Sequence, residues 1–260
     1  YAAYGKILSK VLARSGFACH YELLPDSEKA KSLSAVSRAI SGICAFDKAR
    51  GSLSIVAFGG GVVGDAAGFI AAVYKRGVPC VQVPTTLLAQ VDSSIGGKVA
   101  VDLPAAKNLV GAFYQPRLVL SDTFLLRGLP KRQVITGMAE VIKYGVIKDM
   151  RLFEFIEERL DDVVGLKEGA IERAICRCSA IKAGIVEKDE FDNKGVRMAL
   201  NYGHTIGHAI EAASGYSKRY THGEAVAIGM VIANDIAVGM GLLKASDAVR
   251  IEALIRRAGL

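Results

Sequence analysis

The 260-residue chain contains no tryptophan, only four histidines and five cysteines, and no long apolar run. Its most apolar window, residues 225–243, is interrupted by Asn234 and Asp235. An unbroken stretch of about 18 apolar residues is therefore missing, and no transmembrane helix is expected. Because the sequence also starts without a signal-like segment, we expect a cytoplasmic protein without a membrane partner.

The cysteines are scattered and odd in number: Cys19, Cys44, Cys80, Cys176 and Cys178. Only the last two are close together, and a C-x-C pair alone is a poor zinc signature. The pattern favours free thiols in a reducing compartment.

A strong excess of one charge is also missing. The chain has 33 basic and 26 acidic residues, which gives a formal net charge of +7. This excess is too mild and dispersed for a nucleic-acid-binding surface, but it suits an anionic small-molecule substrate. With 51% apolar and 23% charged residues, the chain is expected to fold and not to be disordered.

The two halves of the chain differ in their hydrophobic periodicity. Up to residue 122, strand patterns at 18–24, 52–58, 79–83 and 117–121 alternate with helix patterns at 4–15, 28–43 and 62–74. Beyond it only helix patterns occur, at 130–147, 152–159, 168–187, 198–214, 223–241 and 246–258. Alternation of strands and helices predicts a mostly parallel sheet. We therefore predict an α/β domain over residues 1–122 and an all-α domain over residues 123–260.

A glycine-rich segment follows one predicted strand and opens the next helix. Gly59, Gly61 and Gly64 satisfy G-x-G-x-x-G, which brings bare backbone and a helix N-terminus close to a pyrophosphate. The next predicted strand ends at Thr85 and Thr86, and not at the acidic residue that binds the ribose in the usual dinucleotide fold. The segment indicates either a variant Rossmann-like fold or a tight strand–helix turn without a ligand.

Three of the four histidines lie within 19 residues: His204, His208 and His222. The first two are four residues apart and share one helix face, which is a recurrent spacing of metal ligands. Core or capping histidines are the alternative interpretation. Since a catalytic zinc takes three protein ligands and keeps an open position, a carboxylate can complete the set.

Glu140 is the first candidate for that carboxylate. It stands in an apolar stretch, where a buried acid needs a partner. Glu211 and Glu224 are rivals because they are close to the histidines in the sequence.

Basic residues stand near these motifs. Lys98 follows two glycines, Lys143 lies one turn after Glu140, Lys182 is on a long predicted helix, and Arg197 lies one turn before Asn201. Each is, taken singly, explained as a solvated charge. Together they indicate a site for a phosphate or a carboxylate.

Six long segments of the chain resemble one family, the 3-dehydroquinate synthases. They are GGGVVGD (59–65), RGVPCVQVPTTLLAQVDSSIGGKVAVD (76–102), KNLVGAFYQP (107–116), GMAEVIKYG (137–145), ALNYGHTIGHAIE (199–211) and HGEAVAIGM (222–230). The segments are specific in order and content, and they cover most of residues 25–230.

The resemblance implies a fold, a reaction and two cofactors. The fold is an α/β NAD-binding domain, a Rossmann-like variant, followed by a helical domain that binds metal and substrate. The reaction is that of a lyase of the shikimate pathway of aromatic amino acid biosynthesis. It converts 3-deoxy-D-arabino-heptulosonate 7-phosphate to 3-dehydroquinate and phosphate. The cofactors are NAD, oxidised and reduced in turn, and a divalent metal, usually zinc and alternatively cobalt. A homodimer is expected, with a sugar phosphate and not a nucleic acid as partner.

The resemblance also assigns residues. The expected metal ligands are Glu140, His204 and His222. The expected catalytic and substrate-binding residues are His208, Lys98, Lys143, Lys182, Arg197, Asn201, Arg76, Asp92 and Asn108. The expected NAD-binding residues are Asp26, Glu28, Lys31, Gly61, Val62, Val63, Gly64, Asp65, Thr85, Thr86, Lys98, Lys107, Leu125, Leu126, Arg127 and Gly128.

The chain departs from the family pattern in three places. Ser27 replaces the glycine of the segment that usually reads PDGE. The opening strands of the family, with an acid for the adenosine ribose, are not in the sequence, and neither is a closing segment with a further substrate-site lysine. The expectation from these differences is a truncated synthase.

Three other functions compete with this interpretation. One is another sugar phosphate cyclase, such as an aminodehydroquinate synthase, although His208 argues against the valiolone-forming cyclases. Another is a metal- and NAD-dependent oxidoreductase similar to glycerol dehydrogenase, which would consume NAD. The third is a non-enzymatic remnant that binds partners, against which the intact histidines, Glu140 and Lys143 argue.

Overall fold

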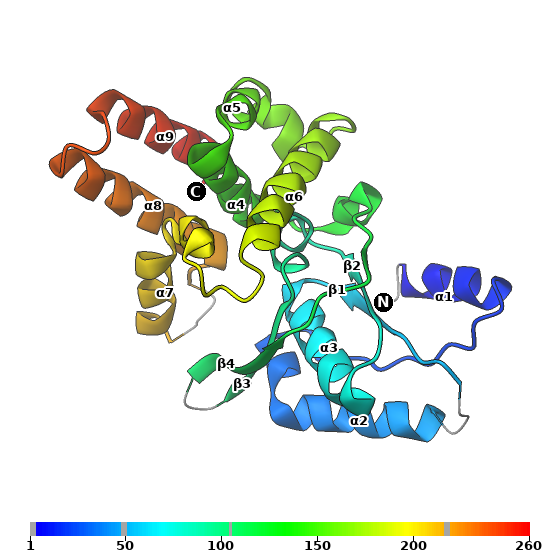
Figure 1. The fold of residues 1–260 in the computed structure, drawn as a ribbon. Helices are drawn as coiled ribbons and strands as arrows, with labels where there is room; N and C mark the ends of the chain where they lie inside the picture. Colours follow the sequence, from blue (N-terminus) through cyan, green and yellow to red (C-terminus); the bar gives the residue numbers. More distant parts are fainter. Residues whose placement is uncertain (1–3, 48–50, 104–105, 216–218) are drawn as a thin grey trace. The chain divides into compact units, whose positions relative to one another are not determined.

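The computed structural model describes residues 4–47, 51–103, 106–215 and 219–260, and it divides into two compact units. One unit comprises the residues up to Thr85 together with Ser93–Leu125. The other comprises Thr86–Asp92 together with Leu126–Leu260. Figure 1 shows the helices and strands of each unit. Within the described ranges, no helix is long and apolar enough to cross a membrane.

A parallel sheet forms the centre of the first unit. Its strands are β1 (Ile55–Gly59), β2 (Cys80–Pro84) and β5 (Leu118–Val119), in the order β1–β2–β5. All are parallel, with Ile55 opposite Cys80 and Val81 opposite Leu118. Helix α3 (Gly61–Val73) follows β1 and packs on the sheet through Ala66, Ile70 and Ala71, which are buried. The predicted α/β class with a parallel sheet is confirmed.

The remaining elements of this unit differ in part from the predicted ones. They are α1 (Gly5–Arg14), α2 (Leu33–Phe46), two 3₁₀ turns at Glu28–Lys31 and Tyr74–Arg76, and an antiparallel hairpin of β3 (Lys98–Leu103) and β4 (Ala106–Phe113). The helix predicted at 28–43 is interrupted because Ser32 is extended and its side chain caps α2 by accepting the Ala35 N–H. The strand predicted at 18–24 is wrong: this segment is irregular, and no described strand pairs with it.

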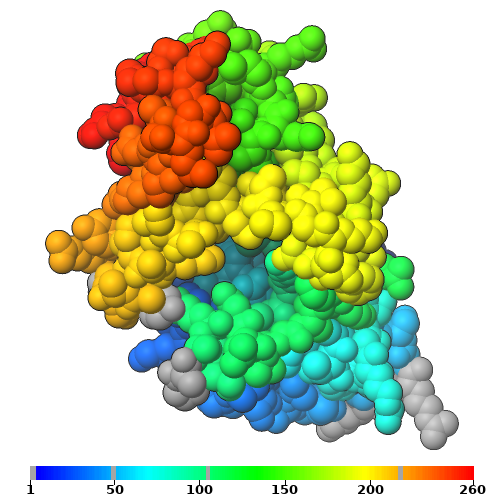
Figure 2. Space-filling view, turned by 60° about the vertical axis from the view of Figure 1, so that its left-hand side comes forward, coloured from blue at the N-terminus to red at the C-terminus, as the bar shows by residue number. Residues whose placement is uncertain are grey.

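The second unit is helical. Its elements are α4 (Lys131–Lys148), α5 (Met150–Val164), α6 (Ala170–Lys188), α7 (His204–Ala213), α8 (His222–Gly239) and α9 (Ala245–Arg257), with a 3₁₀ turn at Val196–Asn201. A 3₁₀ turn at Thr123–Gly128 and a π turn at Ala89–Ser93 include residues of both units. The helix predicted at 198–214 is in fact a 3₁₀ turn followed by α7, because Gly203 between them has a φ of +79°. The space-filling view shows α8 and α9 in orange to red at the surface (Figure 2).

Helix α4 is the buried centre of this unit. All nine residues from Gly137 to Gly145 are buried, and Met138, Ile142 and Tyr144 belong to one large apolar core. A helix surrounded on every side must place its polar residues against partners. Glu140 and Lys143 are the two charged residues in this stretch, so each requires an opposite charge nearby.

The N-terminus of α8 is attached to α4 by an ion pair and by close backbone packing. Arg132 donates from Nε and Nη2 to the two carboxylate oxygens of Glu224, at 2.9 and 2.8 Å. Thr221 and Glu224 form a capping box at this helix end. A Cβ on Gly223 would lie 2.1 Å from the carbonyl oxygen of Thr136, so only glycine permits this approach. These contacts fix the place at which His222 begins its helix.

Candidate active site

A buried carboxylate on α4 is the centre of the site. The Glu140 side chain is 0% exposed and forms an ion pair with the Lys143 ammonium, one turn later on the same helix. Among the described residues, neither Glu140 oxygen accepts a hydrogen bond of ordinary geometry. The predicted common face of Glu140 and Lys143 is thus present, and the carboxylate retains unused coordinating capacity.

Two imidazoles approach this carboxylate from the first residues of two helices. The Nε2 atom of His204 lies 3.4 Å and that of His222 lies 3.7 Å from Oε1 of Glu140. One ligand atom from each of the three residues lies within 4.8 Å of the others. Two imidazole nitrogens and a carboxylate, converging at a buried position, match the donor set of a catalytic zinc centre.

The protonation of the three groups depends on their mutual contacts. Burial raises the pKa of Glu140, but the Lys143 charge outweighs it and the pKa falls to about 2. Burial lowers the pKa of His222, but the nearby carboxylates of Glu140 and Glu211 outweigh it and raise the pKa to about 10. Burial lowers the pKa of His204. The metal-free centre therefore holds a carboxylate and at least one protonated imidazole at neutral pH.

The other polar candidates nearby have different surroundings. His208 is exposed, with its ring centroid 5.4 Å from that of His204. Glu211 lies beside His222, with Oε2 at 3.4 Å from Nδ1. His208, Glu211 and His222 form a second group of ligand atoms within 4.8 Å. Glu224 does not join either group, since Arg132 and the helix cap hold its carboxylate.

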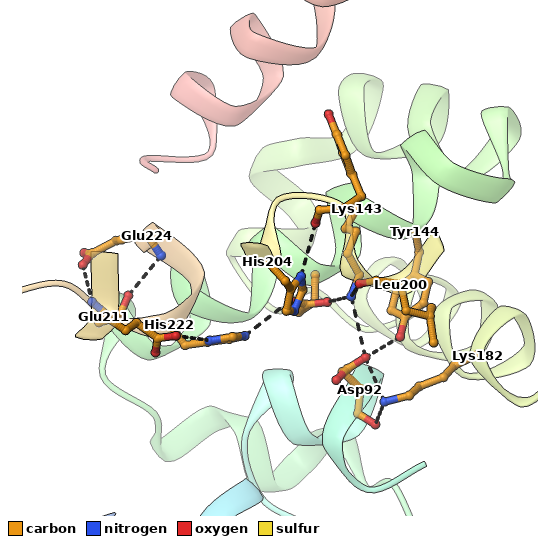
Figure 3. A network of polar contacts seen from close by, with 12 residues as sticks. Asp92, Lys143, Tyr144, Lys182, Leu200, His204, Glu211, His222 and Glu224 are labelled. Atoms are coloured by element: carbon orange, nitrogen blue, oxygen red, sulfur yellow. Dashed lines mark hydrogen bonds and ion pairs between the residues drawn. The ribbon is translucent and has the colours of Figure 1, made fainter. Parts of the chain in front are cut away.

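A second charged cluster lies next to Lys143 in the same unit (Figure 3). The Lys182 ammonium lies 2.9 Å from Oδ1 of Asp92 and donates to the Asp92 carbonyl oxygen at 2.8 Å. Lys143 lies 4.0 Å from the same carboxylate and donates to the Leu200 carbonyl oxygen at 3.0 Å. Tyr144 donates its hydroxyl to Oδ1 of Asp92 at 2.5 Å. The predicted residues Asp92, Lys143 and Lys182 are therefore brought together, with Tyr144 as an addition.

Burial and charge act against each other in this cluster. Burial raises the pKa of Asp92, but the charges of Lys182 and Lys143 outweigh it and hold the pKa well below its usual range. Burial lowers the pKa of Lys182 despite the nearby Asp92.

Tyr144 was missed from the sequence because its neighbours in the chain read as core. A hydroxyl in the middle of a buried helix is the signal that could have found it.

Arg197 and Asn201 lie on the 3₁₀ turn before α7. Arg197 is buried and donates from Nη1 to the Glu190 carbonyl oxygen at 3.0 Å, whereas Asn201 is exposed. The Asp189 carboxylate organises the loop before the turn by accepting the backbone N–H groups of Asn193, Lys194, Val196 and Arg197, at 2.9–3.3 Å. No spacing in the sequence pointed to Asp189.

In the first unit, several predicted NAD and substrate residues meet around Lys31. The ammonium of this buried lysine lies 2.7 Å from Oδ2 of Asp65 and donates to the Asn108 side chain. Lys107 pairs with Glu28 at 3.2 Å. Burial raises the pKa of Asp65, against the attraction of Lys31. This cluster lies beside the first turn of α3, which Gly61 to Asp65 form.

Close packing also explains the glycines of this turn. A Cβ on Gly61 would lie 2.7 Å from the Ser93 hydroxyl, and one on Gly64 would lie 2.9 Å from Oε1 of Gln82. Gln82 also donates to the Gly64 carbonyl oxygen at 3.1 Å. The absence of a Cβ at Gly61 and Gly64 is thus required for packing within the unit, and it also leaves the N-terminus of α3 open to a ligand.

The remaining predicted residues are spread over turns and element ends. Asp26 is exposed, Arg76 has a φ of +66° in an exposed turn, and Lys98 is the exposed first residue of β3. Thr85 donates its N–H to the Gly59 carbonyl oxygen at 2.9 Å, and the Thr86 hydroxyl accepts the Ala89 N–H at 3.2 Å. Within the turn Thr123–Gly128, Leu125 and Leu126 are buried, whereas Arg127 and Gly128 are exposed.

Comparison with known proteins identifies the family. Residues 22–136 match the family model of the 3-dehydroquinate synthase N-terminal domain, and residues 137–260 match that of its C-terminal domain. A curated 3-dehydroquinate synthase of Pelotomaculum thermopropionicum is 51% identical over all of this chain, which covers 69% of that protein.

Two solved structures are similar over nearly the whole chain. One is a 2-epi-5-epi-valiolone synthase from Streptomyces hygroscopicus subsp. jinggangensis 5008 with NAD⁺ and Zn²⁺ bound. It has a TM-score of 0.90 and 28% identity, and the match covers 100% of this chain and 72% of that one. The other is a 2-deoxy-scyllo-inosose synthase with carbaglucose-6-phosphate, NAD⁺ and Co²⁺. It has a TM-score of 0.88 and 36% identity, and the match covers 98% and 69%. Since both halves match the family models and half of the residues are identical to those of a curated synthase, the chain belongs to the 3-dehydroquinate synthase family.

Proposed function

We propose that the protein catalyses the 3-dehydroquinate synthase reaction, in which 3-deoxy-D-arabino-heptulosonate 7-phosphate gives 3-dehydroquinate and phosphate. The observation that carries the proposal is the convergence of Glu140, His204 and His222 in a chain 51% identical to a curated synthase. Lys143 and Lys182 lie in the same unit and can bind the anionic substrate.

The proposed cofactors are NAD and one zinc ion, with cobalt as an alternative metal. Glu140, His204 and His222 would hold the metal, and their donor set supports this because a buried carboxylate and two Nε2 atoms face one another. When bound, the metal polarises a substrate hydroxyl or carbonyl oxygen and NAD accepts and returns a hydride. Solved cyclases of this fold bind NAD⁺ together with Zn²⁺ or Co²⁺, which supports the pair.

The helical unit supplies charges of defined position. Asp92 holds the Lys182 ammonium in place, and Asp92 and Glu140 together balance the charge of Lys143. Because an ammonium group has three N–H donors, each lysine can also donate to a substrate carboxylate or hydroxyl. We assign Arg197 and Asn201 to the same task. His208 is exposed beside His204 and can take up or release a proton at its imidazole nitrogens, which suits proton transfer with the substrate.

The first unit is assigned to NAD. We propose residues 1–122 as the NAD-binding domain and 123–260 as the metal- and substrate-binding domain. The N-terminus of α3 directs the backbone N–H groups of its first turn, from Gly61 onward, at a pyrophosphate. The residues Asp26, Glu28, Lys31, Asp65, Thr85, Thr86, Lys98, Lys107 and Leu125 to Gly128 are assigned to the same cofactor, and Arg76, Asp92 and Asn108 to the substrate.

The resemblance further leads us to propose a cytoplasmic homodimer. Light scattering behind a sizing column measures the assembly directly. A monomer at micromolar concentration would contradict this part of the proposal.

The decisive experiment is phosphate release from the heptulosonate phosphate, with and without added NAD⁺ and Zn²⁺, while absorbance at 340 nm is followed. We expect phosphate release without net NADH formation. Steady NADH formation in proportion to product would support the oxidoreductase alternative. Turnover of the amino analogue alone would support an aminodehydroquinate synthase.

A further inference from the structure

Glu211 contacts the candidate metal centre from outside. It lies in the last turn of α7, seven residues after His204, so both side chains are on the same face of the helix. Its Oε2 atom is 3.4 Å from Nδ1 of His222. The carboxylate is largely covered, with 19% of the side chain exposed. Glu211 therefore faces the side of the His222 ring that points away from Glu140.

The chemistry of this contact fixes which nitrogen carries a proton. An ionised carboxylate only accepts hydrogen bonds, so the contact requires a proton on Nδ1 of His222. A neutral ring then has its lone pair on Nε2, the atom that lies 3.7 Å from Glu140. Glu211 thus selects the tautomer in which His222 can bind a metal beside Glu140.

His204 has an equivalent arrangement with a different partner. Its Nδ1 lies 3.2 Å from the Tyr202 carbonyl oxygen, and its Nε2 lies 3.4 Å from Oε1 of Glu140. Both imidazoles therefore have an acceptor at Nδ1 and face the shared carboxylate through Nε2. For His204 the acceptor is backbone, which a substitution cannot remove. For His222 it is a side chain, which makes its contribution measurable.

We propose that Glu211 is a positioning residue of the metal centre, which orients His222 through Nδ1 so that Nε2 faces Glu140. This inference rests on the metal centre of the proposed function. Metal-ligating histidines generally donate their second N–H to a carboxylate or carbonyl, and loss of that partner weakens metal binding about 10- to 100-fold. The same range is expected here, without any direct bond between Glu211 and the metal.

A direct ligand role is the competing explanation, since Glu211 also belongs to the group with His208 and His222. Two features favour the positioning role. The nitrogen of His222 that Glu211 contacts is not the one that faces Glu140. His208 is exposed, so this group is a more open and more strongly hydrated place for a cation than the buried side of Glu140.

The test measures Kd for Zn²⁺ and Co²⁺ by competition with a chromophoric chelator, in Glu211→Ala, Glu211→Gln and a control. The control is Asp235→Ala, which removes an exposed carboxylate from the helix that carries His222. Glu211→Ala should weaken both metals about 10- to 100-fold. Glu211→Gln keeps a neutral acceptor of about half the strength, so its loss should be roughly 3- to 10-fold. The control should match the wild type.

Four results would overturn the proposal. An unchanged Kd in Glu211→Ala would show that His222 does not depend on Glu211. Equal losses in Glu211→Gln and Glu211→Ala would indicate a direct ligand, as would a large change in the visible absorption of bound Co²⁺ in Glu211→Gln. Failure of the wild type to bind either metal would remove the centre itself. Absence of phosphate release by a wild type that binds metal would contradict the proposed function alone, and the Glu211 test would still be decided by the Kd values.

Discussion

Replacing Lys143 with methionine tests the charge balance inside the helical unit. The ammonium is 1% exposed, pairs with Glu140 and lies 4.0 Å from Asp92. Two unit charges 4 Å apart attract by about 4 kcal/mol at an effective dielectric constant of 20. Methionine fills a similar volume but removes the ammonium that pairs with the buried Glu140 carboxylate. Removal of one partner of a buried pair costs about 3–5 kcal/mol, which we expect as the loss in free energy of unfolding.

The pH dependence of this loss has a definite sign. In the wild type the pKa of Glu140 is lowered to about 2, because the Lys143 charge outweighs burial. Its stabilising contribution is present above the unfolded pKa of about 4.3 and is lost as the pH falls through 2. Without the Lys143 charge the pKa of Glu140 rises from this value, so the carboxylate loses much of its stabilising contribution above pH 4.3. The difference between the two proteins should therefore be largest at neutral pH and should narrow toward pH 4.

The assay is urea unfolding of metal-free protein, followed by circular dichroism at 222 nm between pH 4.5 and 8. The double variant Glu140→Gln, Lys143→Met is the control, since it removes both charges and should be more stable than Lys143→Met alone. A loss below about 1 kcal/mol, the size for an exposed pair, would refute the reasoning. So would a double variant no more stable than the single one.

Three further outcomes are expected. His222→Ala should lose the metal, because a ligand of a three-ligand centre is gone, whereas His208→Ala should retain it and lose turnover; metal content after gel filtration distinguishes them. Zn²⁺ affinity should rise with pH up to about pH 10, by at most about tenfold per pH unit. The reason is that the contacts of His222 raise its pKa to about 10, so a proton competes with the metal for Nε2. A Kd for Zn²⁺ that is independent of pH would contradict this. Asp189→Asn should lower the melting temperature most at neutral pH. Burial raises the pKa of Asp189, but the hydrogen bonds from four backbone N–H groups outweigh burial and lower this pKa. The stabilising contribution of the carboxylate is therefore present above the unfolded pKa of about 3.9 and is lost in acid. An unchanged melting temperature at pH 7 would contradict it.

The sequence predicted the elements whose periodicity is strong. The strands β1 and β2, helix α3 and the long helices α4, α6, α8 and α9 lie within a few residues of their predicted bounds. The hairpin β3–β4 was not predicted. Its second strand includes Lys107, Asn108 at a φ of +55°, and Gly111, which do not read as a strand. The hairpin exists because β3 supplies a partner from outside the segment, and Gly111 lets the Val99 carbonyl oxygen approach closely.

The candidate site was predictable where spacing carries chemistry. The position of Lys143 one turn after Glu140 and the grouped histidines both indicated the centre. The spacing of His204 and His208 favoured the wrong pair for the Glu140 cluster, because helical periodicity cannot show that His222 reaches the same carboxylate from another helix. Tyr144 acts through a contact with Asp92, 52 residues away in the chain, which a single sequence does not encode locally. Asp189 contacts backbone N–H groups four to eight residues later, and Glu211 contacts His222 eleven residues later, so both depend on a loop conformation that spacing alone does not specify.

The glycines beside two of the candidate ligands limit how the site can vary. Gly203 precedes His204, and a Cβ there would lie 2.7 Å from the Val226 carbonyl oxygen; Gly223 follows His222 and abuts the Thr136 carbonyl. Main chain touches main chain at both places, so no side chain can change rotamer to absorb an added methyl group. An alanine at either position must displace a whole helix, and the adjoining imidazole moves with it. A substitution at either glycine would therefore change the distances between the chelating groups, and with them the selectivity for one metal ion over another, while the apolar core remained intact.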